Sequence, residues 1–293
     1  MADDSSPLIS VLMTSYNRFA LIGEAIESVL DSDYSFFELI ILDDASTDDT
    51  VAIAQAYAAK DDRIKVFVNE KNIGDYANRN KAASYATGKY LKYVDSDDRL
   101  LEGGLQYCVA SMEQNAEADW AIMYEHGKIE ERMYDPEEAI QKHFFSTPFL
   151  KVGPGGTIIK TVFFRNLGGY PITYGPANDM YFNLQAACAG KLLLINDCFL
   201  FYRNHEGQEG RNMYSYLYNN YRYLNHGLTQ LNLPVTAAQK QWLTNKLHRR
   251  FAVNISKFFL RTLDLQKTVY AWRSAEFSGS AFLKGIFYFK QQP

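Results

Sequence analysis

The stretch YLKYVDSDD at residues 90–98 is the most informative part of this chain, because an apolar run of strand length ends there in a group of aspartates. The same pattern occurs twice nearer the start of the chain. The run LISVLM at 8–13 leads into the polar turn Thr14–Arg18, and the run FELIIL at 37–42 ends at Asp43-Asp44. Segments with helical spacing separate these runs, so the pattern predicts βαβ units and a parallel sheet.

The remaining elements are predicted from the same periodicities. We expect strands at 8–13, 37–42, 64–68 and 90–94, and helices at 21–30, 50–59 and 76–86. Further along, 144–160 reads as a loop rich in Gly and Pro, 178–189 as a helix, and 191–201 as containing a strand. The first strand is followed by neither a Gly-x-Gly-x-x-Gly nor a Walker-type loop, which argues against dinucleotide-binding and P-loop proteins.

Composition places the chain among globular proteins with a large core. Of its 293 residues 47% are apolar and 22% are charged, which excludes disordered, collagen-like and coiled-coil classes. No run of about 18 apolar residues is present, and no basic region followed by an apolar one opens the chain, so we expect neither a spanning helix nor a signal peptide. The scattered Cys108, Cys188 and Cys198 suit a reducing, cytoplasmic location better than a disulfide or zinc framework.

The net charge of −4 hides a strong asymmetry along the chain. Residues 211–293 hold 12 Lys and Arg but only two acids, a net +10, which leaves −14 for residues 1–210. Beyond Arg211 the pattern is helical, and after Pro234 a second helix is expected with Thr236 as its cap. We therefore divide the chain into a region 1–210 and a basic, aromatic-rich helical region 211–293.

The basic region has two interpretations. Its cations and aromatic faces suit docking on an anionic membrane surface, which would make the protein peripheral on the inner face of the cell membrane. Alternatively, its apolar stripes pack on region 1–210 or on a second subunit of a homo-oligomer, and the charges are solvated. No nucleic-acid motif accompanies the positive charge, so we expect no nucleic-acid partner.

The polar groups after the predicted strands predict a ligand site. In an open parallel sheet, ligands bind beyond the carboxyl ends of the strands. An Asp-x-Asp arrangement such as Asp95-Ser96-Asp97 can hold Mg²⁺ or Mn²⁺, which take oxygen ligands. The alternative is a solvated turn that caps the next helix; the convergence of three polar groups at one sheet edge favours the site.

Four segments together resemble family 2 glycosyltransferases of the GT-A fold. They are residues 9–18, 42–48, 72–80 and 86–98, in the family's order and spacing. The resemblance covers residues 7–100 and extends more faintly to about 205, whereas 211–293 lies outside it. It implies an α/β fold with a Rossmann-like, mostly parallel sheet flanked by helices and a C-terminal helical extension. Residues 7–100 would form the nucleotide-sugar half and 101–210 the acceptor half.

The resemblance also implies an activity. The chain would be an inverting, metal-dependent hexosyltransferase-type enzyme that uses a nucleoside-diphosphate sugar, with UDP first and dTDP second as the carrier. The acceptor would be a hydroxyl of a glycan or of a lipid-linked sugar, in bacterial surface polysaccharide biosynthesis. The cofactor would be Mn²⁺ or Mg²⁺, neutralising charge on the departing diphosphate.

Individual residues take roles by the same resemblance. Asp44, or alternatively Asp43, would accept the base's imide N–H, and Arg18 would pair with phosphate. Asp95 would hold ribose and Asp97 the metal ion, with Asp95 as a further ligand. Arg79 would contact the base or diphosphate; its alternative is a surface helix charge. The donor-binding set is Thr14, Tyr16, Arg18, Asp43, Asp44, Arg79, Asp95, Ser96 and Asp97.

Three assignments fall in the second half of the resemblance. Asp179, in an Asn-Asp pair after a Gly-rich loop, would be the general base that removes the acceptor hydroxyl's proton; alternatively it caps a helix. His205 would reach the metal ion, or else serves as a surface residue. Gly155-Gly156-Thr157 would form the floor on the acceptor side, because glycine permits close backbone approach.

Two other classes of protein stay open. One is a catalytically inactive GT-A-like protein that binds a glycan or nucleotide; the presence of Asp44, Asp95, Asp97 and Asp179 argues against it. The other is a sugar-nucleotide nucleotidyltransferase, which normally carries a Gly-rich loop with Arg and Lys near its N-terminus. The turn Thr14–Arg18 has no such glycines.

Overall fold

The computed structural model of the chain describes residues 6–124, 131–195, 197, 200–203 and 212–288. Its contacts divide the chain into two compact units. The sheet unit comprises 1–135, 149–170 and 190–205, and the helical unit comprises 136–148, 171–189 and 206–293. Each is described below by itself.

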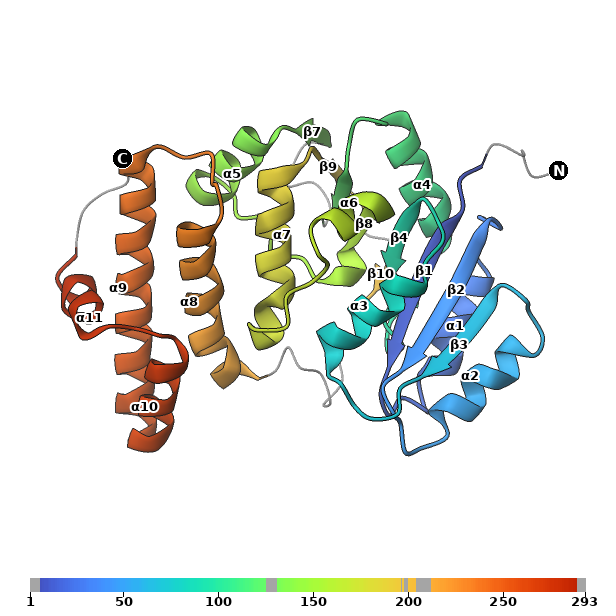
Figure 1. The fold of residues 1–293 in the computed structure, drawn as a ribbon, viewed down its shortest axis with the longest axis horizontal. Helices are drawn as coiled ribbons and strands as arrows, with labels where there is room; N and C mark the ends of the chain where they lie inside the picture. Colours follow the sequence, from blue (N-terminus) through green and yellow to red (C-terminus); the bar gives the residue numbers. More distant parts are fainter. Residues whose placement is uncertain (1–5, 125–130, 196, 198–199, 204–211, 289–293) are drawn as a thin grey trace. The chain divides into compact units, whose positions relative to one another are not determined.

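The sheet unit is built on one large sheet whose strand order is β3-β2-β1-β4-β8-β6-β9-β7 (Figure 1). Strands β1, β2, β3 and β4 are mutually parallel, as predicted, and β8 enters antiparallel to β4 and β6. A second small sheet pairs β5 (Arg99–Leu100) with β10 (Leu200–Phe201). The strands of the large sheet are β1 (Ile9–Ser15), β2 (Phe37–Asp43), β3 (Ile64–Val68), β4 (Tyr90–Tyr93), β6 (Trp120–Met123), β7 (Arg132–Tyr134), β8 (Thr157–Lys160) and β9 (Leu192–Ile195).

The predicted elements of the first hundred residues are confirmed to within two residues at each end. The prediction of a loop over 144–160 is wrong at its end, because β8 occupies Thr157–Lys160 there. This strand is short and takes its stability from pairing with β4 and β6, which local periodicity does not reveal. The helices of the sheet unit are α1 (Ile22–Leu30), α2 (Thr50–Ala58), α3 (Asp75–Tyr85), α4 (Gly104–Gln114) and α6 (Thr161–Asn166).

The side chains of β1 point alternately to the two faces of the sheet, and helices cover both faces. Ile9, Val11 and Met13 point into a core that contains the apolar stripe of α1 and side chains of α2 and α4. Helix α3 also packs on β1 and β2. With helices on both faces, β1 and β2 are buried along their whole length, which is typical of parallel strands.

The register of the parallel strands gathers their carboxyl ends at one edge. Ser15 of β1 pairs with Asp43 of β2, and Leu12 pairs with Tyr93 at the end of β4. The segments that follow these strands, 16–18, 44–46 and 94–98, therefore start side by side. This edge carries the polar groups singled out from the sequence.

The helical unit has its own aromatic core. Tyr221 of α8, Phe251 of α9 and Phe277 pack against one another with ring centroids 4.7–4.9 Å apart. The predicted cap is confirmed: Thr236 accepts a hydrogen bond from the Gln239 N–H and forms a capping box. The helices of this unit are α5 (Pro136–Phe145), α7 (Asn178–Ala189), α8 (Met213–Gln230), α9 (Ala237–Thr262), α10 (Leu265–Ser274) and α11 (Gly279–Ile286). In the described part of the chain, no helix combines the length and the apolar character needed to cross a membrane.

Candidate active site

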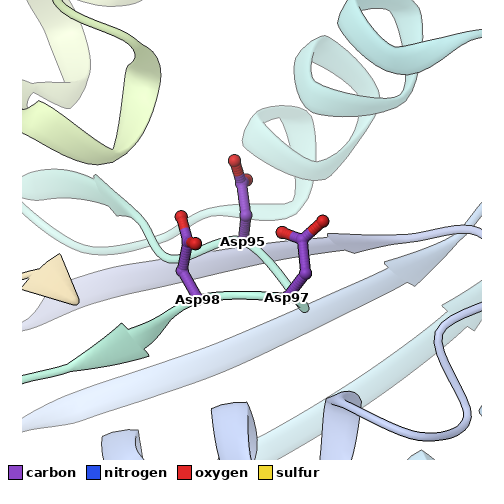
Figure 2. Close-up of side chains that lie close together, drawn as sticks. All are labelled: Asp95, Asp97 and Asp98. Carbon is purple, nitrogen blue, oxygen red and sulfur yellow. The ribbon is translucent and has the colours of Figure 1, made fainter. Parts of the chain in front are cut away.

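Three carboxylates lie together in the turn after β4. Oxygens of Asp95, Asp97 and Asp98 all fall within 4.8 Å of one another, and Figure 2 shows the three side chains rising from this one turn. Carboxylate oxygens are the ligands that Mg²⁺ and Mn²⁺ prefer, and three like charges at this spacing repel one another unless a cation or proton separates them. The donor set therefore fits a hard divalent cation.

Asp98 is the member of this cluster that sequence reasoning left out of the site. Its side chain is buried, and its Oδ1 accepts the backbone N–H of Arg203 at 3.0 Å. Burial, together with the charges of Asp95 and Asp97, raises the pKa of Asp98 to about 7. The sequence does indicate Asp98, because it directly follows Asp97 in the same turn. The Asp-x-Asp pattern, however, includes only Asp95 and Asp97.

Arg79 of α3 anchors the first aspartate of the cluster. Its two terminal nitrogens donate to the two oxygens of Asp95 at 2.6 and 3.0 Å, and its Nε donates to Asp75 at 2.9 Å. Burial alone would lower the pKa of Arg79, but the carboxylates of Asp75 and Asp95 more than offset it and raise that pKa. The guanidinium is thus a buried charge that fixes Asp95, rather than an exposed charge on a helix surface.

The turn after β1 reaches the second aspartate of the cluster. Arg18 Nε lies 3.1 Å from Asp97 Oδ2, and its Nη1 donates to the carbonyls of Tyr16 and Asn17. Asn17 adopts a left-handed backbone with φ 52°, which turns the chain sharply at this point. Thr14 is buried, whereas Tyr16 is exposed beside it. The structure thus brings β1's turn and the aspartate cluster together.

The two aspartates after β2 hold different parts of the backbone. Asp43 accepts hydrogen bonds from the hydroxyls of Ser15 and Ser46 and from the Ser46 N–H. Asp44 accepts from the Asn69 amide and from the N–H groups of residues 73 and 74, at 2.8–2.9 Å. Both carboxylates are buried and well bonded. They shape the two loops that border this edge of the sheet.

The other predicted residues are placed as follows. Ser96 is buried in the turn between Asp95 and Asp97. The Gly155–Gly156 segment forms a short 3₁₀ turn, and the fully buried Lys92 of β4 donates to the Gly155 carbonyl. Asp179 belongs to the helical unit, in the first turn of α7, where its Oδ1 accepts the Met180 N–H at 2.6 Å. His205 lies outside the described residues.

Comparisons with known proteins agree on one family. The sequence profile described as Glycosyl transferase family 2 matches residues 10–165. The chain is 45% identical over 100 residues to the "Putative teichuronic acid biosynthesis glycosyltransferase TuaG" of Bacillus subtilis, which is 34% of this chain and 40% of that protein. It is 34% identical over 125 residues to the "GalNAc(5)-diNAcBac-PP-undecaprenol beta-1,3-glucosyltransferase" of Campylobacter jejuni, 42% of this chain and 39% of that protein. The matched stretches thus span about two fifths of these curated relatives.

Solved structures show the same fold over nearly the whole chain. S. aureus TarS 1-349 in complex with UDP-GlcNAc superposes with a TM-score of 0.71 and 21% identity, covering 95% of this chain and 88% of that one. The mannosyltransferase PcManGT from Pyrobaculum calidifontis, in complex with GDP-Man and Mn²⁺, gives 0.61 and 16%, covering 95% and 78%. The predicted GT-A fold, with its additional C-terminal helices, is confirmed.

Proposed function

Because the chain belongs to glycosyl transferase family 2, we propose that it moves a sugar from a nucleoside diphosphate to an acceptor hydroxyl, with inversion at the transferred carbon. The observation that carries this proposal is the cluster of Asp95, Asp97 and Asp98 at the carboxyl edge of the sheet. A divalent cation there would neutralise the charge that develops on the departing diphosphate. Asp97 and Asp98 would hold it, and Arg79, which donates to both oxygens of Asp95, would keep that carboxylate oriented toward the donor.

The carrier we propose is UDP, with dTDP second. In this proposal Asp44, or alternatively Asp43, accepts the imide N–H of the base, and internal hydrogen bonds hold both carboxylates in fixed positions. One structural neighbour is described in complex with UDP-GlcNAc and also with UDP, which supports a uracil base. Another is described with GDP-Man, so the base is the feature that an experiment has to decide. Thr14, Tyr16 and Arg18 would contact the nucleoside and diphosphate from the turn after β1.

Asp179 is the general base in this proposal. A base must be ionised and must reach the proton of the attacking hydroxyl. The first turn of α7 favours the ionised form, because the positive end of the helix dipole and the Met180 N–H both stabilise a carboxylate there. Asn178 braces the turn by accepting the Tyr174 N–H and donating to the Gly175 carbonyl.

The acceptor we propose is a glycan or a lipid-linked sugar of a bacterial surface polysaccharide. The names of two relatives support this, since one is assigned to teichuronic acid biosynthesis and the other acts on an undecaprenol-linked glycan. A lipid-linked acceptor lies at a membrane surface, so we place the enzyme on the cytoplasmic face of the membrane. The three cysteines Cys108, Cys188 and Cys198 are scattered and odd in number, which suits that reducing side.

Calorimetric titration with UDP, dTDP and GDP, each with and without Mn²⁺, tests the proposal. We expect UDP to bind at least tenfold more tightly with Mn²⁺, and Asp97→Asn to lose that enhancement. Asp62→Asn removes an exposed carboxylate after α2 and is the matched control, which should bind as the wild type does. If folded wild-type protein binds none of the three nucleotides, the chain is not a transferase of this kind, and an inactive glycan-binding protein becomes the better account.

A further inference from the structure

The junction of α9 and α10 exposes apolar side chains in an unusual concentration. We call residues 257–270 the α9–α10 tip; they span the last turns of α9 and the first turns of α10. Six large apolar side chains are exposed here, and Leu260, Leu263 and Leu265 are 72%, 74% and 63% exposed. The six are Phe259, Leu260, Leu263, Leu265, Val269 and Tyr270. Water-exposed apolar groups gathered in this way mark a surface that another phase or molecule covers.

The backbone at the tip points to the same conclusion. Leu263 has φ 53° and closes α9 in the left-handed conformation. Helix ends of this kind normally carry glycine, because a side chain at positive φ costs free energy. Leu263 is about three-quarters exposed, so packing against the described part of the chain offsets little of this cost. An exposed leucine in this backbone conformation suits a surface that another phase or molecule covers.

The tip is also basic. Residues 257–270 contain Lys257, Arg261 and Lys267 against the single acid Asp264. Asp264 is already engaged, since its Oδ1 caps α10 by accepting the Lys267 N–H at 2.8 Å and its Oδ2 lies 3.5 Å from Lys267 Nζ. All three basic side chains belong to exposed residues. Exposed apolar and cationic side chains therefore lie together where α9 ends and α10 begins.

Aromatic contacts hold the tip in place. Tyr214 of α8 donates its hydroxyl proton to the Lys267 carbonyl at 2.8 Å, and its ring lies 5.4 Å from that of Phe258 and 6.4 Å from that of Tyr270. Figure 1 shows α10 beside the C-terminal end of α9, and both helices also contact α8. The exposed leucines therefore sit on a supported helical corner, which is preorganised for binding.

We infer that the α9–α10 tip is a membrane-docking element, which inserts its leucines into an anionic lipid surface while Lys257, Arg261 and Lys267 contact the headgroups. The inference rests on the proposed work at a membrane surface, but not on the chemistry of sugar transfer. A second copy of the chain is the less suitable occupant, because a symmetric pair would set two surfaces of net +2 against each other. An anionic surface neutralises that charge and takes the apolar groups as well.

Co-sedimentation with vesicles tests this inference. The full chain is mixed with vesicles of phosphatidylglycerol and phosphatidylcholine at 1:1, and separately with pure phosphatidylcholine. We expect at least tenfold stronger binding to the anionic vesicles and a large loss of binding in 0.5 M NaCl. Leu260→Gln and Leu265→Gln should each weaken binding about tenfold, because each removes one inserted side chain.

Leu263→Gly is the sharpest variant, because the two roles of this residue respond in opposite directions. Glycine relieves the left-handed backbone at the end of α9, so thermal stability should stay the same or rise. Vesicle binding should nevertheless fall about tenfold. A variant that is at least as stable as the wild type and binds lipid less well cannot be dismissed as misfolded.

Leu283→Gln is the matched control in the same unit. Leu283 is 60% exposed on α11, whose Gly285 packs against the backbone of His248 and Arg249, far along α9 from Leu260. This variant should bind vesicles as the wild type does.

Equal loss in Leu283→Gln and Leu265→Gln, or no wild-type binding to anionic vesicles, would overturn the inference. A wild-type dimer that Leu260→Gln converts to monomer, without vesicle binding, would assign the tip to a second copy instead. UDP binding, measured alongside, reports separately on the proposed transfer chemistry.

Discussion

Asp44 combines an observed role in the fold with the role in donor binding that we propose for it. Its carboxylate is buried and holds the N–H groups of Ile73 and Gly74, which open α3, as well as the amide of Asn69. Asn69 also donates to Asn78, which in turn donates to the carbonyl of Leu42. This network ties the end of β2 to the start of the helix that carries Arg79. The predicted contact with the donor base is therefore built on a residue that the fold also needs.

Asp44→Ala should consequently lower stability as well as nucleotide binding. It leaves buried or half-buried donors without their acceptor, and we expect a loss of about 2–3 kcal/mol in the free energy of unfolding. Urea denaturation measures this directly. Asp33→Ala, which removes an exposed carboxylate before β2, should leave the unfolding midpoint unchanged. Equal midpoints for wild type and Asp44→Ala would show that this network does not stabilise the fold.

Glu38 provides the clearest pH dependence in the sheet unit. Burial acts to raise the pKa of Glu38, but hydrogen bonds from Lys65, Ser10 and Thr87 outweigh it and lower that pKa to about 2. Because the folded-state pKa is depressed, the stabilisation is fully present above about pH 4.5, the value for the unfolded chain, and is lost as pH falls toward 2. Glu38→Gln should therefore cost about 2–3 kcal/mol at pH 7.

The difference between wild type and Glu38→Gln should stay constant from pH 7 to 5 and shrink below 4.5. Denaturation curves at several pH values measure it. Glu102→Gln changes an exposed carboxylate of the same unit and should show neither effect. A constant difference down to pH 3 would contradict the depressed pKa of Glu38.

For single residues, the sequence predicts which side chains lie at the ligand-binding edge of the sheet, but not which partners they contact. It placed Arg18, Asp95 and Asp97 at one sheet edge, where the structure has them. It does not reveal that Arg79 is buried and shared between Asp75 and Asp95, because Asp95 belongs to the turn after β4 and meets Arg79 only in the folded chain. The position of Asp98 beside Asp97 is visible in the sequence, but its burial and its hydrogen bond from the Arg203 N–H are not, because Arg203 is about a hundred residues away.

Elements with strong local patterns were predicted, and elements defined by distant pairing were not. Strands β1 and β2 are largely apolar runs of seven residues each, and they and the shorter β3 appear where the sequence predicts them. Strand β8 has four residues in a Gly- and Pro-rich region, and it forms because β4 and β6 flank it. The order β4-β8-β6-β9-β7 likewise results from contacts between segments far apart in the chain.

Gly88 shows how one position controls an element. A Cβ there would lie 2.6 Å from the Ser10 nitrogen and 2.7 Å from the Leu8 oxygen, both backbone atoms that cannot move aside. Gly88→Ala should push the start of β4 away from β1 and cost about 3 kcal/mol of unfolding free energy. Chemical denaturation gives the value, and Gly279→Ala, where no atom lies within 4 Å, should be close to neutral. Similar stability of the two variants would refute this close approach.

The whole molecule combines segments that are distant in the chain. The change in net charge near residue 211 coincides with the start of the longest segment of the helical unit, but 136–148 and 171–189 also belong to that unit. A charge count along the chain cannot detect that these two earlier segments belong to the helical unit. The family resemblance likewise covers mainly the sheet unit, so its implications are strongest for the donor side and least specific for the helices.

The helical unit should respond separately to damage in its own core. Phe277 is buried, and its ring contacts Tyr221, Phe251 and Trp272 within that unit. Phe277→Ala should cost about 3–5 kcal/mol and raise amide hydrogen exchange in α8 and α9, with β1 to β4 unaffected. Phe287→Ala, which changes an exposed ring on the same unit, should leave exchange unchanged. Uniformly faster exchange across β1 to β4 would contradict separate units.

We propose that the aspartates after β4 hold a divalent cation together with a nucleoside diphosphate. An anomalous difference map from crystals grown with UDP and Mn²⁺ tests it most directly. We expect a manganese peak within coordination distance of Asp97 and of the diphosphate oxygens, and no such peak in Asp97→Asn crystals. UDP bound with no manganese at these aspartates, or manganese bound at another place, would contradict it.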